Sequence, residues 1–465
     1  MNVFKKLAEK LPVADDGEQR ENKSEVKIDT PLKVSEDVIL GLDIGTEYVK
    51  AVIASQNKRG DLEVVGSSRA RQSGASMHSG AIADIPAVVS TCEKALVAAE
   101  KQAGVRAKTA VVGIAGELIK GGTTTIRYRR KNGNRPLTEQ EMNLIIKRVQ
   151  DKAGERAKNE IALETGNPDI EVRLINSAIV SLAIDGYKVS NPLGFKGSDL
   201  VIQFYTAYAP LVHISAIEKV CAELELDLLA VAVEPFAVCR ACLGDDPDSN
   251  LSAIVMDIGG GTTDIAIVDD GGVEGTKMFS IGGRGFTNQI ATMLGVDFDT
   301  AEEMKINPDS ESITEEDAER IGRAIGESLK VWKAGVELAL EEFNPEDVLP
   351  TKVLLCGGGA GLLELQELLA TSDWYENLPF GRRPVIHLVA SEDIPGIIKI
   401  HFVFGLKPRQ KLICLLLSRY INRLISMSQN KSVKIYHIRS RYLFLFSYII
   451  AHKRQIQTFL RILCI

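Results

Sequence analysis

Apolar runs interrupted by glycine turns recur along the chain and predict a repeated strand hairpin. The first, Val38–Ala54, reads VILGLDIGTEYVKAVIA: an apolar strand ends in Asp43, turns at a Gly-Thr pair and returns as a second apolar strand. The second, Ser252–Asp269, reads SAIVMDIGGGTTDIAIVD and repeats the pattern around Asp257. Short apolar runs bounded by glycine are typical of buried strands. Two related domains, each built on one hairpin, are therefore expected.

Both turns have the features of a phosphate site. Consecutive glycines let backbone N–H groups approach a phosphate with no Cβ in the way, and threonine hydroxyls add donors. Lys50 lies on the first return strand, within reach of a phosphate, whereas Asp43 and Asp257 would repel phosphate and are placed to hold a hydrated Mg²⁺. The second turn taken alone also fits an ordinary glycine hairpin. The residues expected at the phosphates are Asp43, Gly45, Thr46, Lys50, Gly259, Gly260, Gly261, Thr262 and Thr263.

A third glycine-rich element follows later in the chain. Val353–Leu363 reads VLLCGGGAGLL, which predicts a strand, three glycines and the start of a helix. Glycines at 357, 358 and 359 would let the backbone approach an adenine or a ribose. Because this element occurs in the same chain as two phosphate-type hairpins, the sequence favours one nucleotide site over three unrelated turns.

The residues between the two hairpins predict an inserted strand and helix subdomain. Thr138-x-x-Glu141 is typical of the start of a helix, because the threonine hydroxyl and the glutamate satisfy free N–H groups there. After the second hairpin, Pro308–Glu342 predicts a small helical region with a charged, solvated face. The expected elements of the insert are helices at 83–104 and 138–157, and strands at 108–116, 122–130, 172–189 and 199–208.

The two ends of the chain differ from its body. Met1–Leu11 predicts a short amphipathic helix, either a membrane or partner contact or a frayed end, before a polar linker. Asp393 is the last of the 62 acidic residues, whereas thirteen of the 55 basic residues follow it. The basic tail is either an interfacial membrane segment or an aberrant end from a shifted reading frame, and its lack of acids favours the second.

Charge and cysteine content narrow the classes of function. The net charge is −7 although the tail is basic, so the body is acidic and general nucleic-acid binding is not expected. Seven scattered cysteines fit a reducing cytosol. Cys239-x-x-Cys242 has no second pair, which favours a packing role over a metal or redox site.

The three motifs resemble those of the actin-like ATPases. Asp43-Ile-Gly-Thr and Asp257-Ile-Gly-Gly-Gly-Thr resemble the phosphate hairpins of that superfamily, and Gly357-Gly-Gly-Ala resembles its adenosine motif. Glu234-Pro235 resembles its first connecting segment. The resemblance implies an α/β, actin-like two-lobed ATPase fold with an inserted strand–helix–strand–strand subdomain. It also implies that a segment around Glu302 and Lys305, which share one helix face, contacts adenine and ribose.

Within the superfamily the chain resembles the FtsA family of bacterial cell-division proteins. The loop Asp185–Gly197, the strand Val111–Gly116 and the run Phe286–Ala291 carry this resemblance. The domains it implies are a short helix and linker (1–37), the first lobe with hairpin 1 (38–81), the insert (82–208), a return to the first lobe (209–250), the second lobe (251–395) and the basic tail (396–465).

The FtsA resemblance implies an ATP-binding cytoskeletal adaptor. ATP would lie between the lobes, with Mg²⁺ held through water by Asp43 and Asp257, and with Glu234 and Asp257 as the catalytic residues of at most a slow ATPase. The implied partners are the C-terminal tail of FtsZ, further copies of the chain in filaments, and an anionic membrane surface. The implied location is cytoplasmic, peripheral on the inner face of the cytoplasmic membrane.

Two other functions fit the same fold. The PilM family of pilus-assembly proteins matches Gly41-Leu-Asp-Ile-Gly and Lys50 about equally well, whereas the loop Asn191–Gly197 favours FtsA. A small-molecule kinase would need a general base beside the γ-phosphate. No additional carboxylate motif in the first lobe indicates one.

Overall fold

A computed structural model describes residues 32–389 apart from 57–61, 117, 190, 244–250, 270 and 344–347. The N-terminal helix expected at 1–11 and the tail expected at 396–465 lie outside the described residues. No described helix combines the length and apolar character that crossing a bilayer demands.

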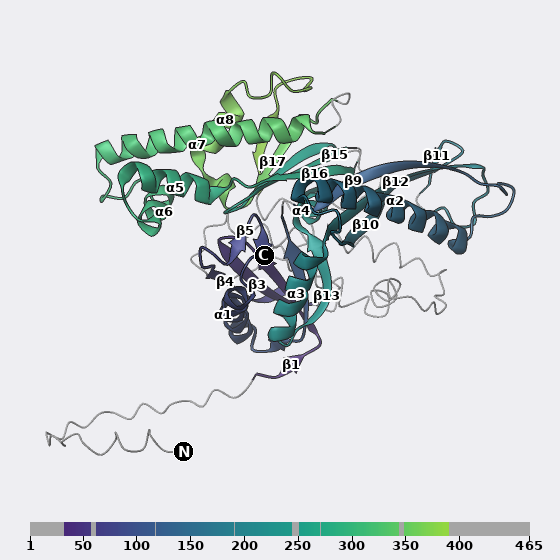
Figure 1. The fold of residues 1–465 in the computed structure, drawn as a ribbon, viewed down its shortest axis with the longest axis horizontal. Coiled ribbons are helices and arrows are strands. Elements are labelled where there is room, and N and C mark those ends of the chain that lie inside the picture. Colours follow the sequence, from purple (N-terminus) through teal and green to yellow (C-terminus); the bar gives the residue numbers. More distant parts are fainter. Residues whose placement is uncertain are drawn as a thin grey trace, which may run out of the picture. The chain divides into compact units, whose positions relative to one another are not determined.

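The first lobe is built on a five-stranded sheet with the order β13-β8-β2-β3-β4 (Figure 1). Hairpin 1 is formed by β2 and β3, as predicted, and β8 and β13 add parallel strands on its other side. Helix α1 (Ile85–Ala103) packs against β3 and β4 and contacts α3 (Leu211–Glu223). The strands are β2 (Val38–Ile44), β3 (Tyr48–Gln56), β4 (Leu62–Arg71), β8 (Thr109–Ile114) and β13 (Asp227–Val233).

The second lobe repeats this strand order. Its strands run β16-β15-β14-β17-β18, so the hairpin again lies at the centre with parallel strands beyond it. The two Asp-x-Gly hairpins therefore hold the same position in two sheets of the same strand order. The strands are β14 (Ala253–Ile258), β15 (Thr263–Asp269), β16 (Gly272–Phe279), β17 (Lys352–Cys356) and β18 (Val385–Leu388).

Helices cover the second sheet, and the longest of them buries a tryptophan against it. The helical region expected at 308–342 is one long helix, α7, which begins after the N-cap Thr314, whose hydroxyl accepts a hydrogen bond from the N–H of Asp317. Trp332 on α7 is fully buried against the sheet. The helices are α4 (Glu234–Leu243), α5 (Gly283–Leu294), α6 (Phe298–Ile306), α7 (Glu315–Glu341), η1 (Gly359–Gly361) and α8 (Leu363–Thr371).

The insert extends the sheet of the second lobe rather than that of the first. Its strands continue the nine-stranded order β11-β10-β12-β9-β16, and Gly122 on β9 pairs with Gly275 on β16. A Cβ on Gly121 would lie 2.5 Å from the hydroxyl of Tyr205, so glycine permits the close approach of strands here. The elements are β9 (Lys120–Arg129), α2 (Glu139–Thr165), β10 (Val172–Ile184), β11 (Tyr187–Lys188) and β12 (Asp199–Pro210).

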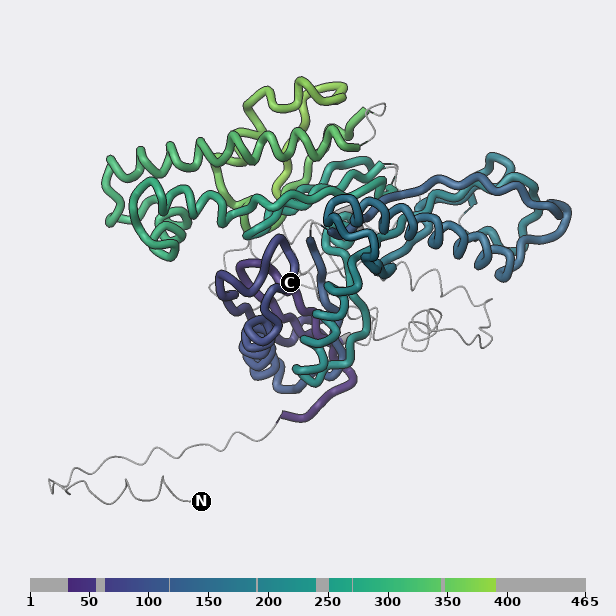
Figure 2. Tube along the Cα trace, viewed as in Figure 1, coloured from purple at the N-terminus to yellow at the C-terminus, as the bar shows by residue number. Residues whose placement is uncertain are grey.

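The start of the insert differs from the expected residue 82. Helix α1 and strand β8 lie with the first sheet, so the chain leaves that lobe only at β9 (Figure 2). The sequences of α1 and β8 do not reveal which lobe they join, because membership of a sheet depends on pairing with strands far away along the chain. Two short ladders complete the described chain: β1 (Val34–Ser35) with β7 (Arg106–Ala107), and β5 (Met77–His78) with β6 (Ala81–Ile82).

One buried arginine fixes the end of the insert. The Arg130 side chain is 1% exposed and pairs with Glu141 on α2 at 2.8 Å, and the hydrogen bond from this arginine lowers the pKa of Glu141. Its guanidinium also donates to the carbonyl oxygens of Gly197 and Arg135. Arg130 therefore joins α2 to two separate loops.

We expect Arg130→Ala to destabilise the insert by about 1–3 kcal/mol, because it leaves buried acceptors without a donor. Limited proteolysis should then cut near residues 130–137 and 191–198 while the lobes remain resistant. The control is Arg156→Ala on α2, which breaks an exposed pair with Glu160 and should change stability by under about 0.5 kcal/mol. Equal protease resistance in both variants would contradict the assignment.

Candidate nucleotide site

Hairpin 1 places a buried ion pair at the edge of the first sheet. Asp43 ends β2, is 2% exposed, and lies opposite Lys50 on β3. The Lys50 Nζ donates to Asp43 Oδ2 at 2.6 Å. The lysine expected to offset phosphate charge is thus bonded to the aspartate expected to hold Mg²⁺. A Cβ on Gly45 would lie 2.8 Å from the carbonyl oxygen of Tyr48, which explains glycine at this tight turn.

Hairpin 2 places two carboxylates side by side. Asp257 on β14 lies directly opposite Asp264 on β15, and both are buried. Burial raises the pKa of Asp257 to about 7, with Lys50 opposing the shift and Asp43 adding to it. Burial and the neighbouring Asp257 also raise the pKa of Asp264. Within the described residues, Asp257 Oδ1 is buried with no hydrogen-bond partner.

Glu234 adds a fourth carboxylate at the start of α4. Burial raises the pKa of Glu234 well above its usual range, and Asp43, Asp257 and Asp264 raise it further, while Lys50 lowers it. The lobes therefore bring together the two predicted catalytic residues and one acid that the sequence did not single out. Asp264 could have been found from the sequence, because the motif DIGGGTTD ends in a second aspartate near the start of the return strand β15.

The glycines of hairpin 2 leave room for the turn of hairpin 1. A Cβ on Gly260 would lie 2.7 Å from the Cβ of Glu47, and one on Gly261 would lie 2.7 Å from Thr46 Cγ2. The N–H of Gly259 donates to Thr262 O at 2.9 Å, whereas those of Gly260 and Gly261 donate to no described group. Both hairpins therefore meet at a point where two backbone donors remain available.

The two threonines of hairpin 2 have different roles. The Thr262 hydroxyl donates to Asp264 at 3.3 Å and stays beside the carboxylates. The expectation that Thr263 offers its hydroxyl to a phosphate is corrected by its contacts: it donates to Ile281 O at 2.7 Å and accepts from the Trp332 indole at 2.9 Å. Strand alternation explains this, because successive side chains point to opposite faces.

The predicted adenosine elements lie against hairpin 2. Gly357 follows β17 with a φ of +85°, and a Cβ there would lie 2.3 Å from Asp257 Oδ1. A Cβ on Gly359 would lie 2.5 Å from Ile258 Cγ2, whereas one on Gly358 would meet nothing within 4 Å. Gly357 and Gly359 therefore allow the end of β17 to pack closely against hairpin 2.

Glu302 and Lys305 share one face of α6, as predicted. Lys305 Nζ donates to Glu302 Oε2 at 2.7 Å, and it also donates to Gly283 O and to the Thr287 hydroxyl. Gly283 begins α5, and its N–H donates to Gly259 O at 2.9 Å. The charged pair is thus connected to hairpin 2 through the start of α5.

An ion cluster that we call the interlobe clasp joins the lobes beside the hairpins. Glu47, in the turn of hairpin 1, accepts from Arg71 at 2.9 Å and from Arg284 on α5 at 2.7 Å. Arg71 also pairs with Asp299 on α6 at 2.6 Å, and both guanidiniums lie over the ring of Phe298. Sequence reasoning missed this clasp because Glu47 and Arg284 lie 237 residues apart along the chain.

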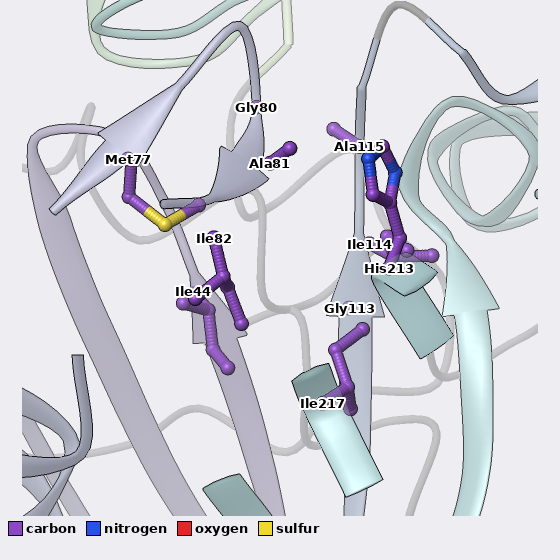
Figure 3. A pocket seen from close by; sticks show the side chains of 10 residues that line it. All are labelled: Ile44, Met77, Gly80, Ala81, Ile82, Gly113, Ile114, Ala115, His213 and Ile217. Atoms are coloured by element: carbon purple, nitrogen blue, oxygen red, sulfur yellow. The ribbon is translucent and has the colours of Figure 1, made fainter. Parts of the chain in front are cut away.

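A small apolar hollow lies beside the end of β2 (Figure 3). His213 on α3 is the one ionisable residue among its lining residues, and burial lowers the pKa of that histidine. None of the predicted site residues lines the hollow, so it is distinct from the hairpin site. Its lining residues are Ile44, Met77, Gly80, Ala81, Ile82, Gly113, Ile114, Ala115, His213 and Ile217.

Comparison with curated proteins identifies similarity to FtsA. The family model for the cell division protein FtsA matches residues 254–390. FtsA of Pseudomonas aeruginosa is 28% identical over 361 residues, which cover 71% of this chain and 80% of that protein. FtsA of Streptococcus pneumoniae is 26% identical, over 58% of this chain and 56% of that protein. The predicted resemblance to FtsA is confirmed.

Comparison with solved structures confirms the actin-like fold. The PilM-PilN type IV pilus biogenesis complex matches with a TM-score of 0.55 and 19% identity, covering 77% of this chain and 89% of that one. At this identity the match shows the fold alone.

The raised pKa of Asp257 predicts a pH dependence of stability. Folded Asp257 keeps its proton up to a pH of about 7, whereas the unfolded carboxyl loses it near 3.8, so this group makes stability fall as pH rises between those values. Asp257→Asn should therefore gain stability relative to the parent between about pH 4.5 and pH 7.5, measured by urea unfolding without divalent cations. Asp169→Asn, at an exposed site, is the control. A constant difference across this range would contradict the prediction.

The clasp predicts energetic coupling between Glu47 and Arg284. We expect a double-mutant cycle of Glu47→Gln and Arg284→Gln to give a coupling of about 1–2 kcal/mol in urea unfolding, because both side chains are largely buried. The exposed Glu327–Lys330 pair on α7 should give under about 0.5 kcal/mol. Equal values for the two pairs would show that the clasp contributes nothing beyond a surface pair.

Proposed function

We propose that this chain is an ATP-binding, actin-like cell-division protein that self-assembles and links FtsZ to the inner face of the cytoplasmic membrane. The observation that supports it best is the meeting of two phosphate-type hairpins from two lobes with the same strand order. The similarity to FtsA proteins supports the cell-division role.

In this proposal the phosphates of ATP bind between the hairpins. The N–H groups of Gly260 and Gly261 supply donors, together with Gly45 and Thr46, while Gly259 closes the turn by donating to Thr262 O. Lys50, which is bonded to Asp43 in hairpin 1, would exchange that partner for a phosphate oxygen. The adenosine would lie against Gly357, Gly358, Gly359, Glu302 and Lys305.

The donor set fits a hydrated divalent cation. Among the described residues, Asp257 Oδ1 is a buried carboxylate oxygen without a partner, and four acids share one lysine, so the site has excess negative charge. Within the described part of the chain, no three acidic, histidine or cysteine side chains converge closely enough to ligate one metal ion directly. Asp43 and Asp257 would thus hold Mg²⁺ through water, where it would neutralise phosphate charge.

Hydrolysis, in this proposal, is slow and serves assembly. Glu234 lies among the carboxylates, where burial and its acidic neighbours raise its pKa, so its ionised form is a stronger base toward a positioned water than an exposed glutamate. A carboxylate that only caps α4 is the structural alternative for this residue. Because the clasp spans both lobes, a change at the phosphates would alter lobe closure.

A PilM-type role is the alternative function on the same fold. The PilM-PilN match, at 19% identity, supports the fold and not the role. Its lower identity and the FtsA-like loop Asn191–Gly197 favour the cell-division role. No observation favours a small-molecule kinase.

Gly260→Val should abolish Mg·ATP binding in a calorimetric titration, because a side chain there occupies the space between the hairpins. The matched control is Gly322→Val on α7, where a Cβ meets nothing within 4 Å, and it should bind like the parent. Binding by Gly260→Val at parental affinity would refute the hairpin assignment.

The division role predicts binding to FtsZ through the FtsZ C-terminal tail. With ATP present, the full chain should sediment with FtsZ filaments, and deleting that tail from FtsZ should release it. Failure to sediment with either FtsZ form would remove the division role while leaving nucleotide binding intact.

A further inference from the structure

The end of the insert remote from the second lobe is formed by two loops. Strand β9 pairs with β16 near its start, at Gly122, and ends at Arg129, so the residues that follow lie at its other end (Figures 1 and 2). We call this region the insert tip: residues 130–137 together with 185–189 and 191–198. It lies outside the nucleotide site and is used by none of the proposed steps.

The insert tip is held in one arrangement. Arg130 donates to carbonyl oxygens in both loops, and the N–H of Gly197 donates to Gly133 O at 2.9 Å. The N–H of Leu137 donates to Phe195 O at 2.7 Å, and a Cβ on Gly133 would clash with Ser198. Side chains on the two loops are therefore presented by a fixed backbone.

Two aromatic rings are exposed on this platform. Tyr187 is 78% exposed on β11, and Phe195 is 50% exposed on the neighbouring loop. Phe and Tyr usually bury most of their surface, so two exposed rings on an ordered loop pair indicate a contact surface.

Basic side chains surround the rings. Lys131, Arg135 and Lys196 are exposed and form no ion pair with a described carboxylate, and Arg129 and Lys188 are also exposed. Asp185 is the acid of the tip and accepts from the N–H groups of Ser198 and Asp199, and the adjacent Asp199 pairs with Arg127 at 2.7 Å. The tip is thus a localised positive surface on a protein of negative net charge.

We propose that the insert tip is a docking surface for an anionic phospholipid bilayer. Lysine and arginine are attracted to anionic headgroups. The Tyr187 ring with its hydroxyl suits the membrane interface, and the apolar Phe195 ring suits insertion at the boundary between headgroups and acyl chains. The acidic body would orient the molecule with this end toward the lipid.

The direct test is fluorescence of Phe195→Trp in the full chain. Both native tryptophans, Trp332 and Trp374, are buried, so quenching by brominated lipid reports on position 195. We expect a blue shift and quenching with vesicles rich in phosphatidylglycerol and neither with phosphatidylcholine. Leu163→Trp is the matched control: it is 85% exposed near the far end of the 27-residue α2, about 40 Å away at about 1.5 Å per residue, and should not be quenched.

The second test removes positive charges from the insert tip with substitutions that keep the side chains polar. The triple variant Lys131→Gln, Arg135→Gln and Lys196→Gln should weaken quenching at position 195 by about a hundredfold in lipid concentration. The control neutralises three exposed lysines elsewhere, Lys94→Gln, Lys330→Gln and Lys352→Gln, and should leave that quenching unchanged.

Three outcomes would overturn the proposal: vesicle sedimentation without quenching at position 195, no response to anionic vesicles, or equal loss in the two triple variants. If the Phe195→Trp variant responds to an acidic peptide but not to vesicles, a protein partner would replace the bilayer. This inference deepens the membrane role of the proposed function and rests on it. Sedimentation with anionic vesicles but no quenching at position 195 would remove the tip contact alone, whereas nucleotide and FtsZ binding are measured without lipid.

Discussion

Four carboxylates share one ammonium group at the junction of the lobes, and much of the architecture serves to hold them there. Asp43 keeps Lys50 as its partner, while Asp257, Asp264 and Glu234 lose solvent without gaining a cation of their own from the described residues. Burying carboxylates in this way is unfavourable unless they are protonated or a positive charge is supplied. A site of this kind is stabilised by what it binds.

The glycines around these acids follow from the same constraint. Gly357 lies so close to Asp257 that a Cβ would be 2.3 Å from its carboxylate oxygen, and a Cβ on Gly260 would be 2.7 Å from the Cβ of Glu47 in the opposing hairpin. Larger residues would separate the strands and admit water. The acids would then return to ordinary carboxylates at an open edge.

The sequence predicted whatever depends on neighbours along the chain. Both hairpins, the helix start at Thr138 and the Glu302–Lys305 pair are local, and each was found as expected. The clasp was not predicted, because Glu47 and Arg284 are separated by most of two domains. The fate of the Thr263 hydroxyl was also missed, since a motif records residue types whereas strand alternation decides which side chain faces the site.

The pairing of Gly122 with Gly275 has a mechanical consequence. The insert is covalently attached to the first lobe at both of its ends, through β8 and α3, yet its sheet is hydrogen-bonded to the second. It is therefore connected to both lobes. A rotation of one lobe relative to the other would either move the far end of the insert or break the strand pairing at these two glycines.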